Sequence, residues 1–249
     1  MPLVKSISTL GSYVTLMGKV FSIPDKWSVF FKQTVKEIWK LIFDSIWIVV
    51  IISVFIGAVI TIQMQLNMAS PLFPRYTVGL ATRDTLLLEF SSAIMCLILA
   101  GKVGSNIASE IGTMRVTEQI DALDIMGVNS ANYLILPKIV ALVAFIPLLV
   151  ILSMSTGILG GYFVALMTSM ISVDTYVYGI QTMFVPYYVF YSIYKSFVFA
   201  FIIASISSYY GYTVKGGALE VGKASTNAVV ISSVIILLFD VILTKLLLQ

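Results

Sequence analysis

The sequence predicts an all-α protein that crosses a membrane five times, with an N-terminal interfacial helix ahead of the first crossing. Two features of its composition lead to this prediction. Hydrophobic residues make up 59% of the 249 residues, whereas charged residues make up only 11%. Soluble domains carry roughly 25% charged residues, so most of this chain must lie in an apolar solvent. Its apolar runs of about 20 residues fit a hydrocarbon core about 30 Å thick.

The residue types that the chain lacks argue against several kinds of site. The sequence contains no histidine, and its single cysteine, Cys96, lies in an apolar run. Without histidine, the commonest metal ligand and the usual general base are both missing. One cysteine cannot form an intrachain disulfide. We therefore predict no catalytic residue and no metal site in this chain, and no nucleic-acid partner.

Residues 1–40 form the first of two predicted regions, ahead of a transmembrane domain over residues 41–249. Apolar residues recur there every three or four positions, as on one face of a helix. They are Leu3, Ile7, Leu10, Val14, Met17 and Phe21. Lysines and serines fall on the other faces, which is typical of a helix that lies in the membrane interface. A short soluble helix packed on a partner would show the same pattern.

Five apolar runs predict the crossings. Four of them cross once each, at about 41–66, 86–101, 186–206 and 228–248. The remaining run, 133–168, would be about 54 Å long as one helix and could instead be two short helices that turn at its glycines. Lysine placement favours one crossing, because only then do Lys215 and Lys223 share a side with the lysines of residues 1–40. The positive-inside rule makes that side, and the N-terminus, cytoplasmic.

One stretch, residues 100–128, interrupts the apolar pattern with six acidic or basic residues close together. It reads AGKVGSNIASEIGTMRVTEQIDALDIMGV. Two apolar stripes predict short helices within it. The first stripe is Ile107, Ile111 and Met114, and the second is Ile120, Leu123 and Met126. A loop that only joins two helices needs a handful of residues, so this length favours a docking element over a solvated connector. We expect the stripes to supply most of the affinity for a partner and the charges to set its orientation.

Three blocks of the sequence carry a family resemblance. They read ASEIGTMRVTEQIDALDIMGV, IYKSFVFAFIIASISSYYGY and KGGALEVGKASTNAVVISSVIILLFDVILT, and with their flanks they cover most of the chain from about residue 45. The chain thus resembles MlaE-type permeases, the membrane subunits of ABC transporters that move phospholipid in bacterial envelopes and chloroplasts. The resemblance implies a homodimer in a bacterial inner membrane, with a role in outer-membrane lipid asymmetry.

By this resemblance, residues 102–130 are a cytoplasmic coupling segment that docks on a separate ABC ATPase. The residues that we assign to it are Glu110, Gly112, Arg115, Glu118, Gln119, Asp121 and Gly127. ATP and Mg would be held by that partner, since this chain has no G-x-x-x-x-G-K-[ST] motif to cradle phosphates and would not itself be an enzyme. The other implied partners are a periplasmic MCE-domain protein and, in some complexes, a STAS-domain protein.

Three ionisable residues fall inside predicted crossings, where charge is costly and usually faces the protein interior. Lys195 and Asp240 lie at matching depth in consecutive crossings, so they could pair, or each could extend separately to the interface. Glu89 belongs by resemblance to a Glu-Leu-Gly-Pro motif. That motif here reads Glu-Phe-Ser-Ser, so the Gly-Pro kink is lost.

A lipid cavity is expected around the end of the first crossing, because methionine adapts to irregular apolar ligands. The residues assigned to it are Gln63, Met64, Leu66, Met68 and Glu89. The polar members could instead only hold helices together. The predicted function is a permease subunit that moves phospholipid between the inner membrane and the MCE partner. An ion-coupled secondary transporter and a non-transporting scaffold are the alternatives.

Overall fold

A computed structural model describes residues 2–24, 26–68, 73–168 and 171–248. Within these ranges the regular elements are all helices, which confirms the predicted fold class. Five of the helices described there are long and apolar enough to cross a membrane. They are Trp27–Asn67, Thr77–Val116, Ser130–Met167, Tyr187–Tyr212 and Ala218–Leu248.

Two of these spans consist of consecutive α-helical and π-helical pieces. The first contains α2 (Trp27–Glu37), η1 (Ile38–Phe43) and α3 (Asp44–Asn67). The second contains α4 (Thr77–Thr85), η2 (Leu86–Ile94), α5 (Met95–Leu99), η3 (Ala100–Gly104) and α6 (Ser105–Val116). The remaining spans are α8 (Ser130–Met167), α10 (Tyr187–Tyr212) and α11 (Ala218–Leu248). Within the residues that the structure describes, the remaining helices are shorter: α1 (Pro2–Val20), α7 (Gln119–Ile125) and α9 (Val173–Gln181).

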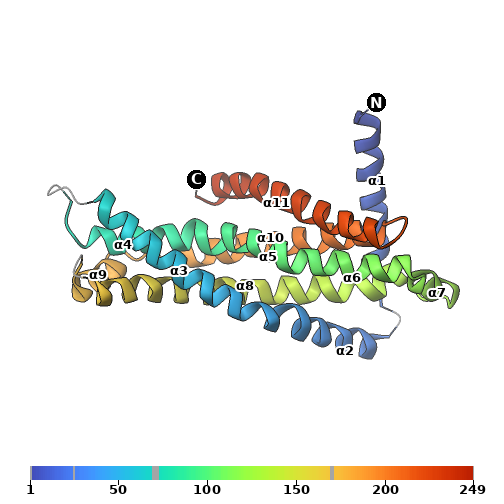
Figure 1. Ribbon diagram of the computed structural model, residues 1–249, viewed down its shortest axis with the longest axis horizontal. Coiled ribbons are helices and arrows are strands. Elements are labelled where there is room, and N and C mark those ends of the chain that lie inside the picture. The colour runs from blue at the N-terminus through green and yellow to red at the C-terminus, as the bar shows by residue number, and fades with distance from the viewer. Residues whose placement is uncertain (1, 25, 69–72, 169–170, 249) are drawn as a thin grey trace. The chain divides into compact units, whose positions relative to one another are not determined.

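The ambiguous third crossing is one continuous helix. Helix α8 runs unbroken for 38 residues, and it is drawn as one uninterrupted coil in Figure 1. At 1.5 Å per residue this is about 57 Å, well beyond the thickness of a bilayer core of about 30 Å, so its ends extend outside the hydrocarbon region. The prediction of five crossings is confirmed.

The second crossing is distorted at Glu89. Glu89 lies in η2, nine residues of π-helix in which the backbone is wider than in an α-helix. π-Helical turns are rare and occur frequently at functional sites. The second crossing therefore departs from regular α-helix at Glu89 without a proline.

The chain divides into two compact units, and every crossing contributes a piece to each of them. The first unit consists of Met1–Asp44, Leu97–Phe145 and Val198–Phe239. The second consists of Ser45–Cys96, Ile146–Phe197 and Asp240–Gln249. The predicted division of the chain after residue 40 stays a prediction, since residues 1–44 belong to a unit that also contains parts of every crossing.

In the first unit, α1 is held by hydrogen bonds along its second half. The Tyr13 hydroxyl donates to Oγ of Ser205 at 2.9 Å. At the far end, the Asn132 amide donates to the carbonyl of Val20 at 2.8 Å. Met17 of the predicted stripe is buried, whereas Leu10, Val14 and Phe21 are exposed. The side chains of Leu3 and Ile7 lie outside those that the structure describes. Helix α1 thus keeps an exposed apolar face.

In the second unit, α3 and α8 approach each other at glycines. A Cβ on Gly57 would lie 1.8 Å from the carbonyl oxygen of Gly157, and one on Gly160 would lie 2.0 Å from that of Val54. Small residues permit this backbone contact between membrane helices. Nearby, Ser53 donates a hydrogen bond of 2.8 Å to Ser153. This contact fixes the register of the first crossing against the third within the unit.

The loop after α9 is fixed by a buried arginine. Arg83 is 2% exposed, and its Nη1 donates to the carbonyls of Ile180 at 2.6 Å and Thr182 at 2.8 Å. Its guanidinium also pairs with Asp84 at 2.7 Å.

On α9 itself, burial raises the pKa of Tyr176 to about 12, so its hydroxyl stays protonated. That hydroxyl donates to the carbonyl of Ile158 at 3.1 Å.

Candidate functional site

The charged stretch forms two helices, α6 and α7, that meet at a tight turn within the first unit. The turn is made at Glu118, whose φ of +60° lies in the left-handed region, and α7 is followed by Gly127 at φ +77°. Glycine adopts such a φ without steric cost, which explains Gly127. Gln119 donates to Oγ1 of Thr117 at 3.0 Å across the same turn. The stretch is therefore an ordered element, as expected.

The two predicted apolar stripes are mostly turned into the protein. Ile107, Ile111 and Ile120 are fully buried within this chain. These three cannot contact a partner, whereas Met126 of the second stripe is exposed, so a contribution of the stripes to partner affinity stays a prediction for the exposed members alone. The spacing of apolar residues indicates that a helix face is covered, but not by what. Here other parts of the first unit cover it.

Residues of α7 and its two caps, including Met126 of the second stripe, face outward, and we call them the α7 tip. It consists of Glu118, Gln119, Asp124, Ile125 and Met126. Ile125 is 87% exposed and Met126 is 68% exposed. Large apolar side chains at such exposure, surrounded by charged and polar ones, are typical of an interaction site.

The remaining assigned residues divide between the surface and the interior. Arg115 Nη1 pairs with Oδ1 of Asp121 at 2.7 Å, and both side chains are partly exposed. The Arg115 guanidinium also lies 5.8 Å from the centre of the Tyr212 ring. Gly112 is buried, and a Cβ there would lie 3.1 Å from Val221, so it permits α6 to pack on the start of α11.

Glu110 lies in a network of ion pairs. Its Oε1 is 2.6 Å from Lys40 Nζ, and its Oε2 is 2.7 Å from Lys138 Nζ. Lys138, which is 3% exposed, also pairs with Glu37 at 2.7 Å. The sequence pattern did not indicate Glu37, Lys40 and Lys138 as partners of Glu110. The available signal was Lys138 itself, a lysine inside an apolar run.

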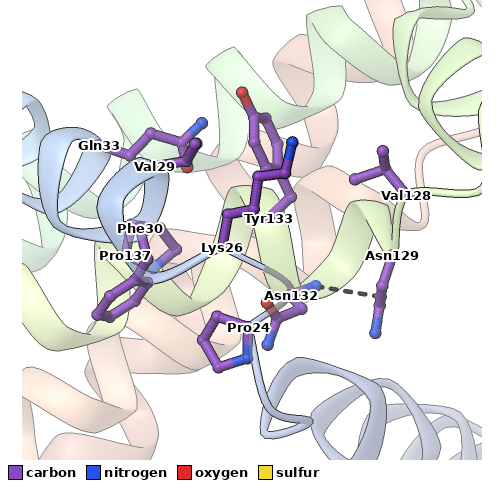
Figure 2. Close-up of a pocket in the computed structure, with 10 residues that line it drawn as sticks. All are labelled: Pro24, Lys26, Val29, Phe30, Gln33, Val128, Asn129, Asn132, Tyr133 and Pro137. Atoms are coloured by element: carbon purple, nitrogen blue, oxygen red, sulfur yellow. Dashed lines mark hydrogen bonds between the residues drawn. The ribbon is translucent and has the colours of Figure 1, made fainter.

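Two small cavities lie beside this network. The first, of about 210 Å³, is lined by residues of α2, the start of α8 and the segments that precede them. Figure 2 shows it, with Lys26, Gln33 and Tyr133 among the side chains around it. The second, of about 230 Å³, is lined by Glu37, Glu110 and Lys138 and also by Gln33 and Tyr133.

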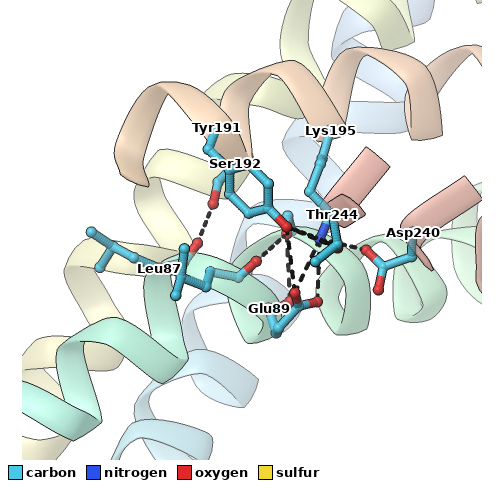
Figure 3. A network of polar contacts seen from close by, with 9 residues as sticks. Leu87, Glu89, Tyr191, Ser192, Lys195, Asp240 and Thr244 are labelled. Atoms are coloured by element: carbon cyan, nitrogen blue, oxygen red, sulfur yellow. Dashed lines mark hydrogen bonds and ion pairs between the residues drawn. The ribbon is translucent and has the colours of Figure 1, made fainter. Parts of the chain in front are cut away.

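The three intramembrane charges meet within the second unit. Lys195 is fully buried, and its Nζ lies 2.6 Å from Oδ1 of Asp240 and 3.2 Å from Oε2 of Glu89. It also donates to Tyr191 at 2.9 Å and to Thr244 at 3.2 Å. Figure 3 shows the Lys195 side chain extending from α10 between the two carboxylates. We call these five residues the intramembrane cluster.

The intramembrane cluster contains one cation and two carboxylates. The side chain of Asp240 is 16% exposed, whereas that of Glu89 is 41% exposed. The charge of Lys195 is therefore compensated mainly by Asp240, the more buried and nearer of the two carboxylates. The Glu89 carboxylate is the member of the cluster that is open to its surroundings.

The residues assigned to a lipid cavity at the end of α3 lie on two faces. Met64 and Met68 pack against a core of Val78, Ala165, Ile171 and Tyr176. Gln63 and Leu66 are exposed on the other side, Leu66 by 65%. A larger apolar cavity, of about 410 Å³, lies elsewhere, in the first unit among α1, α10 and α11. Sequence analysis did not anticipate that cavity, because residues far apart in the chain line it.

A profile of the family described as permease MlaE matches residues 34–246 of this chain. The chain belongs to the MlaE permease family. It is thus a transmembrane subunit of an ABC transporter, and membership implies a separate ATPase partner. This favours the permease over an ion-coupled secondary transporter.

Individual relatives agree with the family. A probable ABC transporter permease of Rickettsia bellii is 36% identical over 222 residues, 88% of this chain and 84% of that protein. One from Rickettsia conorii is 32% identical over 98% of this chain and 93% of its own length. The chloroplast protein trigalactosyldiacylglycerol 1 of Arabidopsis thaliana is 30% identical over 88% of this chain and 63% of its own length.

Proposed function

We propose that this permease moves phospholipid, or a related lipid, between a bacterial inner membrane and a periplasmic MCE-domain protein. The observation that carries the proposal is the α7 tip, an exposed apolar surface on an ordered helical turn outside the long apolar runs. A partner ATPase docks there, binds ATP and Mg, and drives movement of the crossings. The working unit is a homodimer of this chain, to which a STAS-domain protein can be added.

The direction of insertion follows from charge. With five crossings, the lysines of residues 1–40 lie on the same side of the membrane as Lys102, Lys215 and Lys223. The positive-inside rule assigns that side to the cytoplasm. The N-terminus and the α7 tip are then both cytoplasmic, where an ATPase has access to ATP.

Lipid as the substrate is supported by the intramembrane cluster and by one relative. Glu89 is partly open, and a carboxylate beside Lys195 and Tyr191 offers polar contacts to a headgroup while exposed Leu66 offers apolar contact to acyl chain. The Arabidopsis relative is named for trigalactosyldiacylglycerol, which is a glycerolipid. Gln63, Met64 and Met68 adjoin the same end of α3 and complete the proposed lipid-binding set.

Purification of the tagged chain from its native membrane in mild detergent, followed by mass spectrometry of co-eluting proteins, tests the proposal. We expect an ABC ATPase and an MCE-domain protein with the wild-type chain. Ile125→Glu together with Met126→Glu should remove the ATPase and leave the MCE protein, since loss of a central apolar contact costs about 2 kcal/mol or more. Lys223→Gln, at an exposed lysine outside the α7 tip, is the matched control. A wild-type chain that elutes alone would contradict the proposal.

A further inference from the structure

Four charged residues from four helical elements of the first unit are joined by a continuous chain of ion pairs, which we call the ion clamp. They are Glu37 of α2, Lys40 of η1, Glu110 of α6 and Lys138 of α8. Three pairs connect them, Lys40 to Glu110 at 2.6 Å and Lys138 to both Glu110 and Glu37 at 2.7 Å. The clamp holds two positive and two negative charges and is neutral overall.

Glu110 has both carboxylate oxygens engaged inside this chain. Oε1 accepts from Lys40 and Oε2 accepts from Lys138. Desolvation by burial alone would raise the energy of its charged form, and the two ammonium groups compensate for it. A partner protein that paired with Glu110 would have to displace one of these lysines. The α7 tip, by contrast, needs no displacement to make contact.

Helix α6, which carries Glu110, is packed tightly on its other faces. A Cβ on Gly211 would lie 2.7 Å from the carbonyl of Ala108, so α6 and α10 are in backbone contact. Ile107 and Ile111 are fully buried. A force on the α7 tip would therefore act on α6 as one tightly packed element, and the ion clamp is what connects that element to α2 and η1. Element η1 continues directly into α3, the rest of the first crossing.

We propose that Glu110 is a positioning residue that transmits movement of α6 to α2 and η1 through Lys138 and Lys40, and not a contact for the ATPase. This inference rests on the proposed function, because it assumes that the ATPase docks on the α7 tip. It divides the residues of the coupling segment into two groups. The α7 tip binds the partner, and the ion clamp converts that binding into movement of the first crossing.

The test uses the whole complex purified in a non-lipid detergent, to which phospholipid is then added, and compares Glu110→Gln and Lys138→Met with wild type. ATPase content per permease should remain at the wild-type value. ATP turnover without substrate lipid should stay within about twofold of wild type, while its stimulation by phospholipid should fall by about fivefold or more, the usual range of a coupling free energy. Lys138→Arg keeps the charge and should retain most of the stimulation.

Inversion of all four charges provides the rescue. Glu37→Lys, Lys40→Glu, Glu110→Lys and Lys138→Glu together restore all three opposite pairs, so stimulation should return toward the wild-type value. A cluster that only stabilises the fold predicts lower yield or thermal stability, with unchanged stimulation per assembled complex, and that result would overturn the inference. Loss of the ATPase from Glu110→Gln, as from the α7-tip variant, would also overturn it and leave the proposed function intact. A wild-type chain without an ATPase would instead refute the proposed function.

Discussion

Lys195 on α10 and Asp240 on α11 form an ion pair of 2.6 Å between Nζ and Oδ1 inside the second unit. The lysine is fully buried, and Glu89 from the second crossing approaches the same ammonium to 3.2 Å. One cation thereby joins three crossings. Because charges inside a membrane bundle are costly unless paired, the lysine is the member whose removal leaves most uncompensated charge.

Lys195→Met should destabilise the protein by about 3–5 kcal/mol, since it leaves two carboxylates without their cation. Thermal unfolding in detergent, followed by tryptophan fluorescence, measures the loss. Lys245→Met is the control, because Lys245 is an exposed lysine on α11, the helix that carries Asp240. It should change the midpoint of thermal unfolding little. Asp240→Asn should cost less than Lys195→Met, and the two together should cost less than their sum because they share one interaction. Additive effects would show that the two charges act separately.

Gly57→Val should disrupt the contact between α3 and α8, since a Cβ at Gly57 would lie 1.8 Å from the Gly157 carbonyl oxygen. Separating the two backbones should cost about 1–3 kcal/mol or more. The measurement is the amount of folded protein in the membrane and its thermal midpoint. Gly222→Ala, in α11 with no atom within 4 Å of the new Cβ, is the control. It should be neutral or mildly stabilising, because alanine is the better helix former.

Arg83→Lys should destabilise the loop after α9, although it conserves the charge. The guanidinium donates to three carbonyls, those of Ile180, Thr182 and Met183, and a lysine ammonium cannot reproduce this planar fork. We expect a loss of about 2–3 kcal/mol and faster proteolysis at residues 180–185. Arg75→Lys is the control, because Arg75 is exposed and lies just before α4, the helix that carries Arg83. It should leave the stability and the proteolysis rate unchanged. Equal effects of the two variants would contradict the assigned role of Arg83.

Gly127→Ala should loosen the end of α7. At φ +77° an alanine is strained, and no neighbouring atom would otherwise exclude it. The cost is about 1–2 kcal/mol, and hydrogen exchange should increase in residues 119–127 but not in α6. Unchanged exchange there would mean that the turn can adopt another backbone conformation.

Composition and periodicity were enough to predict the helical class, the five crossings and the helical character of residues 100–128. The prediction that α8 crosses once followed from lysine placement. Two crossings there would put Lys215 and Lys223 on the opposite side of the membrane from the lysines of residues 1–40. The direction in which Ile107 and Ile120 point did not follow, since a stripe repeats the same way whether it is covered by a partner or by the chain itself. The partners of Glu110 were also missed, because Lys40 and Lys138 lie 70 and 28 residues away in sequence. Such pairs depend on the packing of helices, which periodicity does not encode.

The most direct test of the account is ATP-driven lipid movement by the purified complex. Fluorescent phospholipid in proteoliposomes that contain this chain and its ATPase is followed as it moves to or from the soluble part of the MCE partner. The account predicts movement that requires ATP and is lost with Ile125→Glu/Met126→Glu. Movement that is independent of ATP, or ATP hydrolysis without lipid movement in the fully assembled complex, would contradict it.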